Sequence, residues 1–204
     1  SSASSFSVFD GRVGVIRALG HAQRLCEQGQ TCIVGAVDTL VDSDVVRTLY
    51  AHGRLLSGGD GVGLQPGEAA AFVALEPVGA RPAWGAPVLE HWDMNRIIDS
   101  GRPALGKGLA ATARQLASRD AVWPISDCNG ETHRSTEWGY AAVQDDVLRA
   151  SIDHSRRDTG AASPAVGLVL ALRAFARGYA PAQTALLLAA DALGPRGVLT
   201  IHAV

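Results

Sequence analysis

AASPAVGLVLALRAFARGYAPAQ, TALLLAADALG and PRGVLTIHAV follow one another in Ala161–Val204, and this stretch decides the fold of the chain. In its first part, small and apolar residues recur with the spacing of a helix. The two parts that follow are apolar runs of strand length. The stretch therefore predicts one helix followed by two strands.

The same order of elements occurs near the start of the chain. A helical GRVGVIRALG run lies within Gly11–Gln30, and the strand-like segments TCIVGAVD and EAAAFVALE follow it. Aligning Thr31–Asp38 with Thr184–Asp191 places Thr on Thr and Asp on Asp. A repeat this long is not one of the short solenoid periods, so it indicates two halves of one duplicated α/β fold.

Composition excludes several classes of protein. The 204 residues are 47% hydrophobic and 19% charged, which is enough apolar material for a large core. A net charge of -2 and scattered Arg residues argue against general affinity for nucleic acid or membranes. The three cysteines, Cys26, Cys32 and Cys128, form no CxxC motif, which is typical of a reducing compartment. With no bilayer-spanning run and no signal-peptide pattern, we expect a cytoplasmic protein.

Between the two copies, further helices and strands alternate, which favours a layered α/β fold. Helices are expected at Gly14–Gln28, Asp42–His52, Ala104–Ser118 and Thr136–Ile152, and strands at Thr31–Val37, Glu68–Glu76, Val88–Met94 and Ala121–Ser126. The strand Thr31–Val37 is a continuous apolar run, which is typical of a sheet covered on both faces.

The segment Gly53–Gly67 is rich in glycine, which predicts unusual backbone angles or a close approach to another group. A phosphate-binding loop would need a strand before it and a helix N-terminus after it. Here a helix precedes the segment and a strand follows. Nucleotide binding is therefore disfavoured, and we expect no cofactor.

Four segments carry a family resemblance. CIVGAVDTLVD (32–42) is similar to a strand entering a "VGGVDS" turn, and GRLLS with QPGEAAA (53–71) is similar to "GRLS…PGEGAA". HSRRDTGAASPAVGLVLAL (154–172) resembles a "GHTGAASG" loop and its helix, and DALGPRGVLTIHAV (191–204) resembles a Gly-rich "FGFGGTNAHV" hairpin. Together, and in this order, they resemble the β-ketoacyl synthase (condensing-enzyme) branch of the thiolase fold.

The resemblance implies a thiolase-like fold, in which duplicated α/β halves have mixed sheets covered by helices. Residues 1–80 would then be the C-terminal portion of the first half, and residues 81–204 the second half. Family members carry further strands and helices ahead of the Gly14–Gln28 helix. We therefore expect the N-terminal part of the fold to be missing from this chain, since half a sheet would leave an unpaired edge.

The resemblance also implies where a catalytic centre should be. Condensing enzymes use a thiolate at a helix N-terminus and two His donors beside an oxyanion hole. Matching the motifs places Arg12 at the nucleophile position, Asn129 (beside Cys128) in the first His-bearing loop, and Asp158 at the second His. A carboxylate cannot donate a hydrogen bond unless it is protonated, so we expect no condensation by the family mechanism.

Cys128 and His133 form the alternative nucleophile and base. Their cluster follows Asp127 and could be a relocated Cys–His centre. Asp-Cys-Asn-Gly is also ordinary turn chemistry, and the turn is favoured.

Structural interpretations are also favoured for the other candidates. His91 and Asp93 lack a third ligand, so we expect no metal. Cys26 and Cys32 are expected in the core. The segment around Glu131, Arg134 and Glu137 is typical of a capped helix start with a solvated face. Asp158 could cap the next helix, or the head of that helix could hold an anion or an acyl-carrier phosphate.

The sequence therefore predicts a ketosynthase-like pseudoenzyme of fatty acid or polyketide biosynthesis. As in the chain-length factors of the family, it would form a homodimer, or a heterodimer with a ketosynthase. An acyl carrier protein or acyl thioester is the expected partner, with no nucleic acid and no membrane. The alternative is an acyltransferase or 3-oxoacyl-carrier-protein synthase with a non-standard nucleophile, or with one in the missing part.

Overall fold

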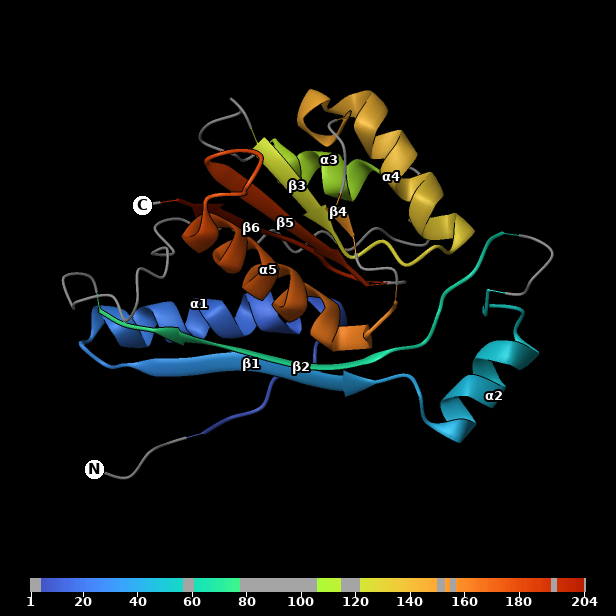
Figure 1. Cartoon of the computed structure of the whole chain (residues 1–204), viewed down its shortest axis with the longest axis horizontal. Helices are drawn as coiled ribbons and strands as arrows, with labels where there is room; N and C mark the ends of the chain where they lie inside the picture. The colour runs from blue at the N-terminus through green and yellow to red at the C-terminus, as the bar shows by residue number, and fades with distance from the viewer. Residues whose placement is uncertain are drawn as a thin grey trace.

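Sheets and helices alternate in layers, as Figure 1 shows for the computed structural model of the chain. The structure describes residues 5–56, 61–77, 106–114, 122–149, 153–154, 157–191 and 194–203. In chain order the elements are η1 (Gly11–Val13), α1 (Gly14–Glu27), β1 (Cys32–Thr39), α2 (Ser43–Ala51), β2 (Glu68–Leu75), α3 (Lys107–Ala113), β3 (Val122–Ser126), α4 (Thr132–Gln144), η4 (Asp146–Arg149), β4 (Asp153–His154), η5 (Gly160–Ala162), α5 (Ser163–Arg177), β5 (Thr184–Ala190) and β6 (Arg196–His202).

The two helix–strand–strand copies lie face to face in the middle of the molecule. β1 pairs antiparallel with β2, and the second sheet has the order β4-β3-β5-β6. In that sheet β3 is parallel to β4 and β5, and β6 is antiparallel to β5. Helices α1 and α5 fill the space between the sheets, and α3 and α4 cover the far side of the four-stranded sheet (Figure 1). The α/β architecture with mixed sheets covered by helices is confirmed.

The buried core depends on small residues in the two central helices. Ile16 and Leu19 of α1 are fully buried, as are Ala171 and Ala174 of α5. A side chain at Gly167 would collide with Leu187 and approach Ile125, so this glycine lets α5 lie directly on the sheet. Close packing of this kind is what the apolar periodicity of both helices indicated.

Most of the expected elements are found within one or two residues of their expected ends, which is the usual uncertainty at helix and strand termini. The second helix of the chain begins where Asp42 accepts hydrogen bonds from the backbone N–H groups of Asp44 and Val45. The expected strand Val88–Met94 lies outside the described residues, and the helix expected at Ala104–Ser118 is described as α3.

Two expectations are wrong. The helix expected at Thr136–Ile152 begins earlier, at Thr132, and ends at Gln144, after which η4 follows. The apolar signal of this helix begins only at Trp138, because its first turn is polar. The run Thr31–Val37 is covered on one face only. Ile33 and Val37 are 78% and 67% exposed on the outer face of β1, whereas Val34 on the inner face is buried.

Candidate functional site

The heads of the two central helices are capped reciprocally by aspartates from the opposite copy. The backbone N–H of Arg12 donates to Asp191 Oδ1 at 2.8 Å, and that of Ala161 donates to Asp38 Oδ2 at 2.7 Å. Asp38 and Asp191 are the aspartates that the sequence repeat aligns. Each copy therefore fixes the helix head of the other.

A glycine stands at each of these caps because the carboxylate comes so close. Gly11 and Gly160 have φ of +53° and +58°, in the left-handed region. A Cβ on Gly11 would run into the Asp191 carboxylate, and one on Gly160 into that of Asp38. The duplicated pattern is thus visible in backbone geometry as well as in sequence.

Of the three residues expected at the family's catalytic positions, Asp158 contacts both of the others. The guanidinium of Arg12 donates from Nη2 to both oxygens of Asp158, at 2.5 and 2.6 Å. Asn129 Nδ2 donates to Asp158 Oδ2 at 2.7 Å. Asp158 and Asn129 are 3% and 7% exposed, so this contact is shielded from water.

Asp158 is ionised in this arrangement. Burial alone would raise the pKa of Asp158, but the charge of Arg12 and the hydrogen bonds from Arg12, Asn129 and the Gly160 N–H outweigh burial, and the pKa lies below its ordinary value. Burial likewise opposes the charge of Arg12, yet Asp127 and Asp158 raise the pKa of Arg12 overall. The centre therefore holds a buried ion pair, which has no proton to give at neutral pH.

A chain of alternating charges runs from this centre into the layer beneath α3 and α4. Arg134 is ion-paired to Asp127 through Nη2, and its Nη1 donates to Glu137 at 3.1 Å. Glu137 also accepts from Arg196 Nε of β6 at 2.8 Å. Arg134 is 4% exposed and Glu137 fully buried. The solvated face expected for Glu131, Arg134 and Glu137 is therefore wrong, because their charges find partners inside the protein.

The C-terminal part of the glycine-rich segment Gly53–Gly67 packs against the loops that carry Asn129 and Asp158. The Gly67 N–H donates to the backbone oxygen of Asp158, and the Asp158 N–H donates to Gln65, both at 2.8 Å. Gly63 donates to the carbonyl of Gly130 at 3.0 Å. The close approach expected for this segment is thus an approach to the two loops that carry Asn129 and Asp158.

Glu131 joins this segment to the centre. Its carboxylate accepts from Arg54 Nε at 2.7 Å and from Asn129 Nδ2 at 2.8 Å. Burial would raise the pKa of Glu131, but the hydrogen bonds from Arg54 and Asn129 outweigh it and lower the pKa. Asn129 thus donates to two carboxylates at once.

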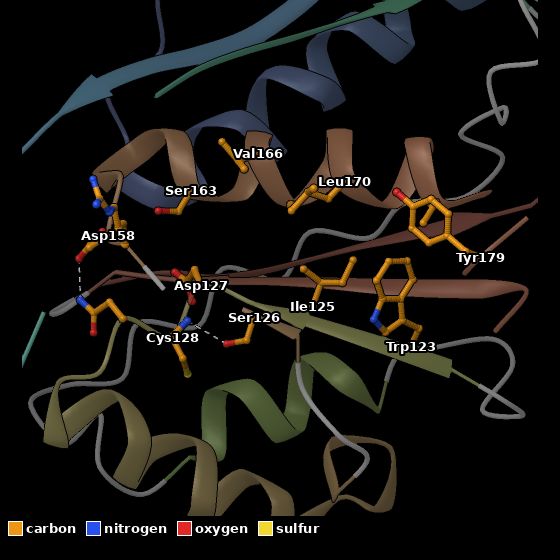
Figure 2. Close-up of a pocket in the computed structure, with 14 residues that line it drawn as sticks. Trp123, Ile125, Ser126, Asp127, Cys128, Asp158, Ser163, Val166, Leu170 and Tyr179 are labelled. Carbon is orange, nitrogen blue, oxygen red and sulfur yellow. Dashed lines mark hydrogen bonds between the residues drawn. The ribbon is translucent and has the colours of Figure 1, made fainter. Parts of the chain in front are cut away.

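A cavity of about 270 Å³ lies between α5 and β3, and Figure 2 shows its lining. At one end Trp123 and Tyr179 face each other, with Leu170 and Ile125 alongside. The opposite end is polar and is lined by Ser126, Asp127, Cys128, Asn129, Arg157, Asp158 and Ser163. The volume is near the lower end of the range for small-molecule sites, about 300–1,000 Å³.

The alternative pair Cys128 and His133 is not joined by any hydrogen bond among the described residues. Cys128 lines the cavity, and its backbone N–H donates to Ser126 Oγ at 3.0 Å. Burial raises the pKa of the Cys128 thiol, which opposes thiolate formation. His133 has its pKa lowered, chiefly by burial.

The remaining candidates are placed as follows. His91 and Asp93 lie outside the described residues, and within the described ranges no three His, Cys, Asp or Glu side chains cluster so as to hold a metal. Asp158 accepts from the Gly160 N–H at 2.9 Å, but the N-cap residue of η5 is Thr159, whose side chain makes no capping hydrogen bond. In the same ranges, no helix is long and apolar enough to cross a membrane.

Motif matching missed the capping pair Asp38 and Asp191 and the central carboxylate Asp127. The repeat had aligned the two capping aspartates, so the signal for their role was available in the sequence. Asp127 receives Arg134 and the Ala190 N–H and lies 3.9 Å from Arg12 Nη1. Its partners come from three separate parts of the chain, which no local pattern reveals.

Comparison with known proteins identifies the architecture. No family model and no curated protein matches the chain. Among solved structures, it is similar to a chain of the AntDE–AntF complex, a type II polyketide synthase acyl-carrier protein with its ketosynthase bound to the hexaketide, at 19% identity and a TM-score of 0.74. That match covers 100% of this chain and 59% of the other.

Two more solved structures give the same result. The ishigamide ketosynthase/chain length factor is 21% identical, with a TM-score of 0.63 over 96% of this chain and 56% of the other. The ketosynthase from module 6 of the bacillaene synthase of Bacillus subtilis 168 is 11% identical, with a TM-score of 0.74. That match covers 95% of this chain and 46% of the other. The chain thus spans about half the length of these structures. Its fold is the thiolase-like fold of the ketosynthases and their chain-length factors.

Proposed function

We propose that this protein is a ketosynthase-like subunit that binds acyl groups or their carrier without catalysing condensation. The observation that carries the proposal is the Arg12–Asp158–Asn129 contact at the heads of the two central helices. By the motif match, these three positions correspond to the nucleophile and the two His donors of a condensing enzyme.

None of the three side chains supplies the chemistry that condensation needs. A guanidinium stays protonated and is no nucleophile. Asp158 is ionised and accepts hydrogen bonds only, and Asn129 Nδ2 is already engaged by two carboxylates. A thioester carbonyl placed between these residues would meet neither a thiolate nor a histidine donor.

Binding remains possible because the adjacent cavity is apolar along most of its length. Trp123, Leu170 and Tyr179 can contact an alkyl or aryl group, while the polar end offers the Ser163 hydroxyl to a thioester or amide. The cavity would hold only a short or medium acyl group. We therefore propose acyl thioesters as the ligand class and an acyl carrier protein as the donor.

The partner side of the proposal is supported by the proteins of similar fold. One neighbour is described as an acyl-carrier protein in complex with its ketosynthase, and another as a ketosynthase/chain length factor. By analogy, we propose that this chain pairs with itself or with an active ketosynthase, in fatty acid or polyketide biosynthesis in the cytoplasm. Residues 1–80 and 81–204 would contribute to the first and second thiolase-like halves.

The binding proposal is tested with a fluorescent medium-chain acyl-pantetheine thioester. Leu170 lines the cavity, so the larger side chain of Leu170→Trp would occupy part of it. Because Leu170 is 51% exposed, the substitution leaves the core undisturbed. Val143→Trp, on α4 and 73% exposed, is the matched control. We expect Leu170→Trp to weaken binding about tenfold or more, which corresponds to about 1.4 kcal/mol, with the control unchanged. Equal binding by both variants would exclude this cavity as the acyl site.

A second candidate function is acyl transfer through Cys128, since its thiol lines the cavity. It would require Cys128 to take an acyl group from a thioester as its own thioester and release the carrier thiol. The raised pKa of Cys128 opposes this step. Acyl-thioester turnover that disappears in Cys128→Ala would favour the transferase, and turnover that persists would remove Cys128 from consideration.

A further inference from the structure

Cys26 and Cys32 lie together at the turn that joins α1 to β1, away from the proposed acyl site. Cys26 is in the last turn of α1 and Cys32 is the first residue of β1. The Cys32 thiol points at the carbonyl of Ala22, 3.9 Å away, one helical turn before Cys26. Because helical side chains lean toward the N-terminus, the Cys26 side chain covers this same turn.

The two side chains therefore lie over the same turn of α1, close enough that burial and then the charge of Cys32 raise the pKa of Cys26. Both side chains are partly buried. Cys32 packs against the hydrophobic core, as the sequence predicted. Cys26 is only partly buried, because it lies at the open end of α1, beyond the fully buried turns.

The intervening turn holds the two cysteines in place. Gly29 takes φ of +82° and donates to the carbonyl of Cys26 at 2.9 Å, and the Gln30 N–H donates to Leu25 at 3.0 Å. These hydrogen bonds form a tight turn, after which β1 runs back along α1. The turn therefore returns the chain so that Cys32 lies beside the last two turns of α1, where Cys26 is.

We propose that Cys26 and Cys32 are a redox-active dithiol, which a low-molecular-weight disulfide such as glutathione disulfide oxidises to an intramolecular disulfide. One thiolate attacks the disulfide, forms a mixed disulfide and releases the first small thiol. The second cysteine attacks the protein sulfur of that mixed disulfide and releases the second small thiol. In total the protein loses two protons and two electrons, and one small disulfide becomes two thiols.

The cross-link would stiffen the unit that holds the site. Arg12 lies in η1, directly before α1, and the far end of β1 carries Asp38, which binds the Ala161 N–H of η5. Oxidation joins these two elements at their opposite ends and closes a short loop, from Cys26 to Cys32. We expect the midpoint of thermal unfolding to rise by about 5 °C, from the loop-closure entropy removed in the unfolded chain.

The test is incubation of the purified protein with glutathione disulfide, followed by intact mass and peptide mapping. Burial, and next the charge of Cys32, raise the pKa of the Cys26 thiol, so the reaction is run at about pH 8. The expected product has lost two hydrogens, contains a Cys26–Cys32 cross-linked peptide, and is restored by a dithiol reductant. Cys128→Ser, which removes the third thiol, should give the same product.

The single variants Cys26→Ser and Cys32→Ser should instead keep one glutathione adduct each, because the resolving thiol is gone. Circular dichroism checks that both variants remain folded. The proposal is overturned if the wild-type protein accumulates stable glutathione adducts on Cys26 or Cys32, or if both thiols stay reduced while the protein remains folded. Since neither cysteine lines the cavity, these outcomes are independent of acyl binding.

Discussion

Asp158→Asn is the substitution that most directly perturbs the site, because it removes the charge that faces Arg12 and keeps the shape of the side chain. Breaking one partner of a buried ion pair costs about 3–5 kcal/mol. Here the cost is reduced because Asp127 stands 3.9 Å from Arg12 and because Asn can still accept from the Gly160 N–H. We therefore expect about 2–3 kcal/mol, or a fall of about 5–10 °C in the unfolding midpoint.

The pH dependence of this difference identifies its cause. The pKa of Asp158 is lower in the folded protein than its ordinary value of about 3.9. A carboxyl group of this kind contributes stability that is fully present above its unfolded pKa and is lost as the pH falls through the folded pKa. The gap between wild type and Asp158→Asn should thus be full at pH 7 and shrink below about pH 4.

The assay is chemical denaturation of both proteins across that pH range, with Asp146→Asn as control. Asp146 pairs with Arg149 at 2.8 Å, but its side chain is 83% exposed, so its loss should cost less than about 0.5 kcal/mol. The double variant Arg12→Met/Asp158→Asn should lose less than the sum of its single variants. A gap for Asp158→Asn that stays constant with pH, or no gap at pH 7, would refute the buried ion pair.

Three further predictions concern the surroundings of the site. Gly11→Ala should lower the unfolding midpoint by more than Gly29→Ala. Both positions have positive φ, but only a Cβ at Gly11 would collide with a carboxylate, that of Asp191. Equal falls in the midpoint would contradict the reciprocal caps. Glu137→Gln should lower the free energy of unfolding, measured with denaturant, by about 3 kcal/mol, because Arg134 and Arg196 lose their shared buried partner. An unchanged free energy of unfolding would contradict the chain of alternating charges. Cys128 should react with iodoacetamide more slowly at pH 7 than a free cysteine peptide, by mass spectrometry, and faster as pH rises; fast labelling at neutral pH would contradict its raised pKa.

Periodicity was enough to locate the central helices, because α1 and α5 each bury a face whose spacing is visible in the sequence. The strands β1 and β5 were located by the length of their continuous apolar runs. The repeat located both helix heads, and the motif match selected the three residues that the structure brings into contact there. That these positions correspond to the family's catalytic residues remains a proposal, as does the division into residues 1–80 and 81–204.

Polar side chains that become buried could not be predicted in this way. Arg134 and Glu137 occupy a polar helical turn that is typical of an exposed face. Their burial is favourable because Asp127, at the end of β3, and Arg196, distant in sequence on β6, pair with them. For β1, both faces are apolar in sequence, so the pattern cannot indicate that Ile33 and Val37 are left uncovered. In each case the deciding contact is tertiary.

Decarboxylative condensation is the most direct test of the central claim, that this ketosynthase fold lacks condensing chemistry. The purified protein is incubated with an acyl thioester and a malonyl thioester, and the 3-oxoacyl product is followed over time by mass spectrometry. We expect product at the level of the protein-free reaction and no acyl adduct on the chain. Product that accumulates in proportion to the protein, and is lost on heat denaturation, would contradict the claim.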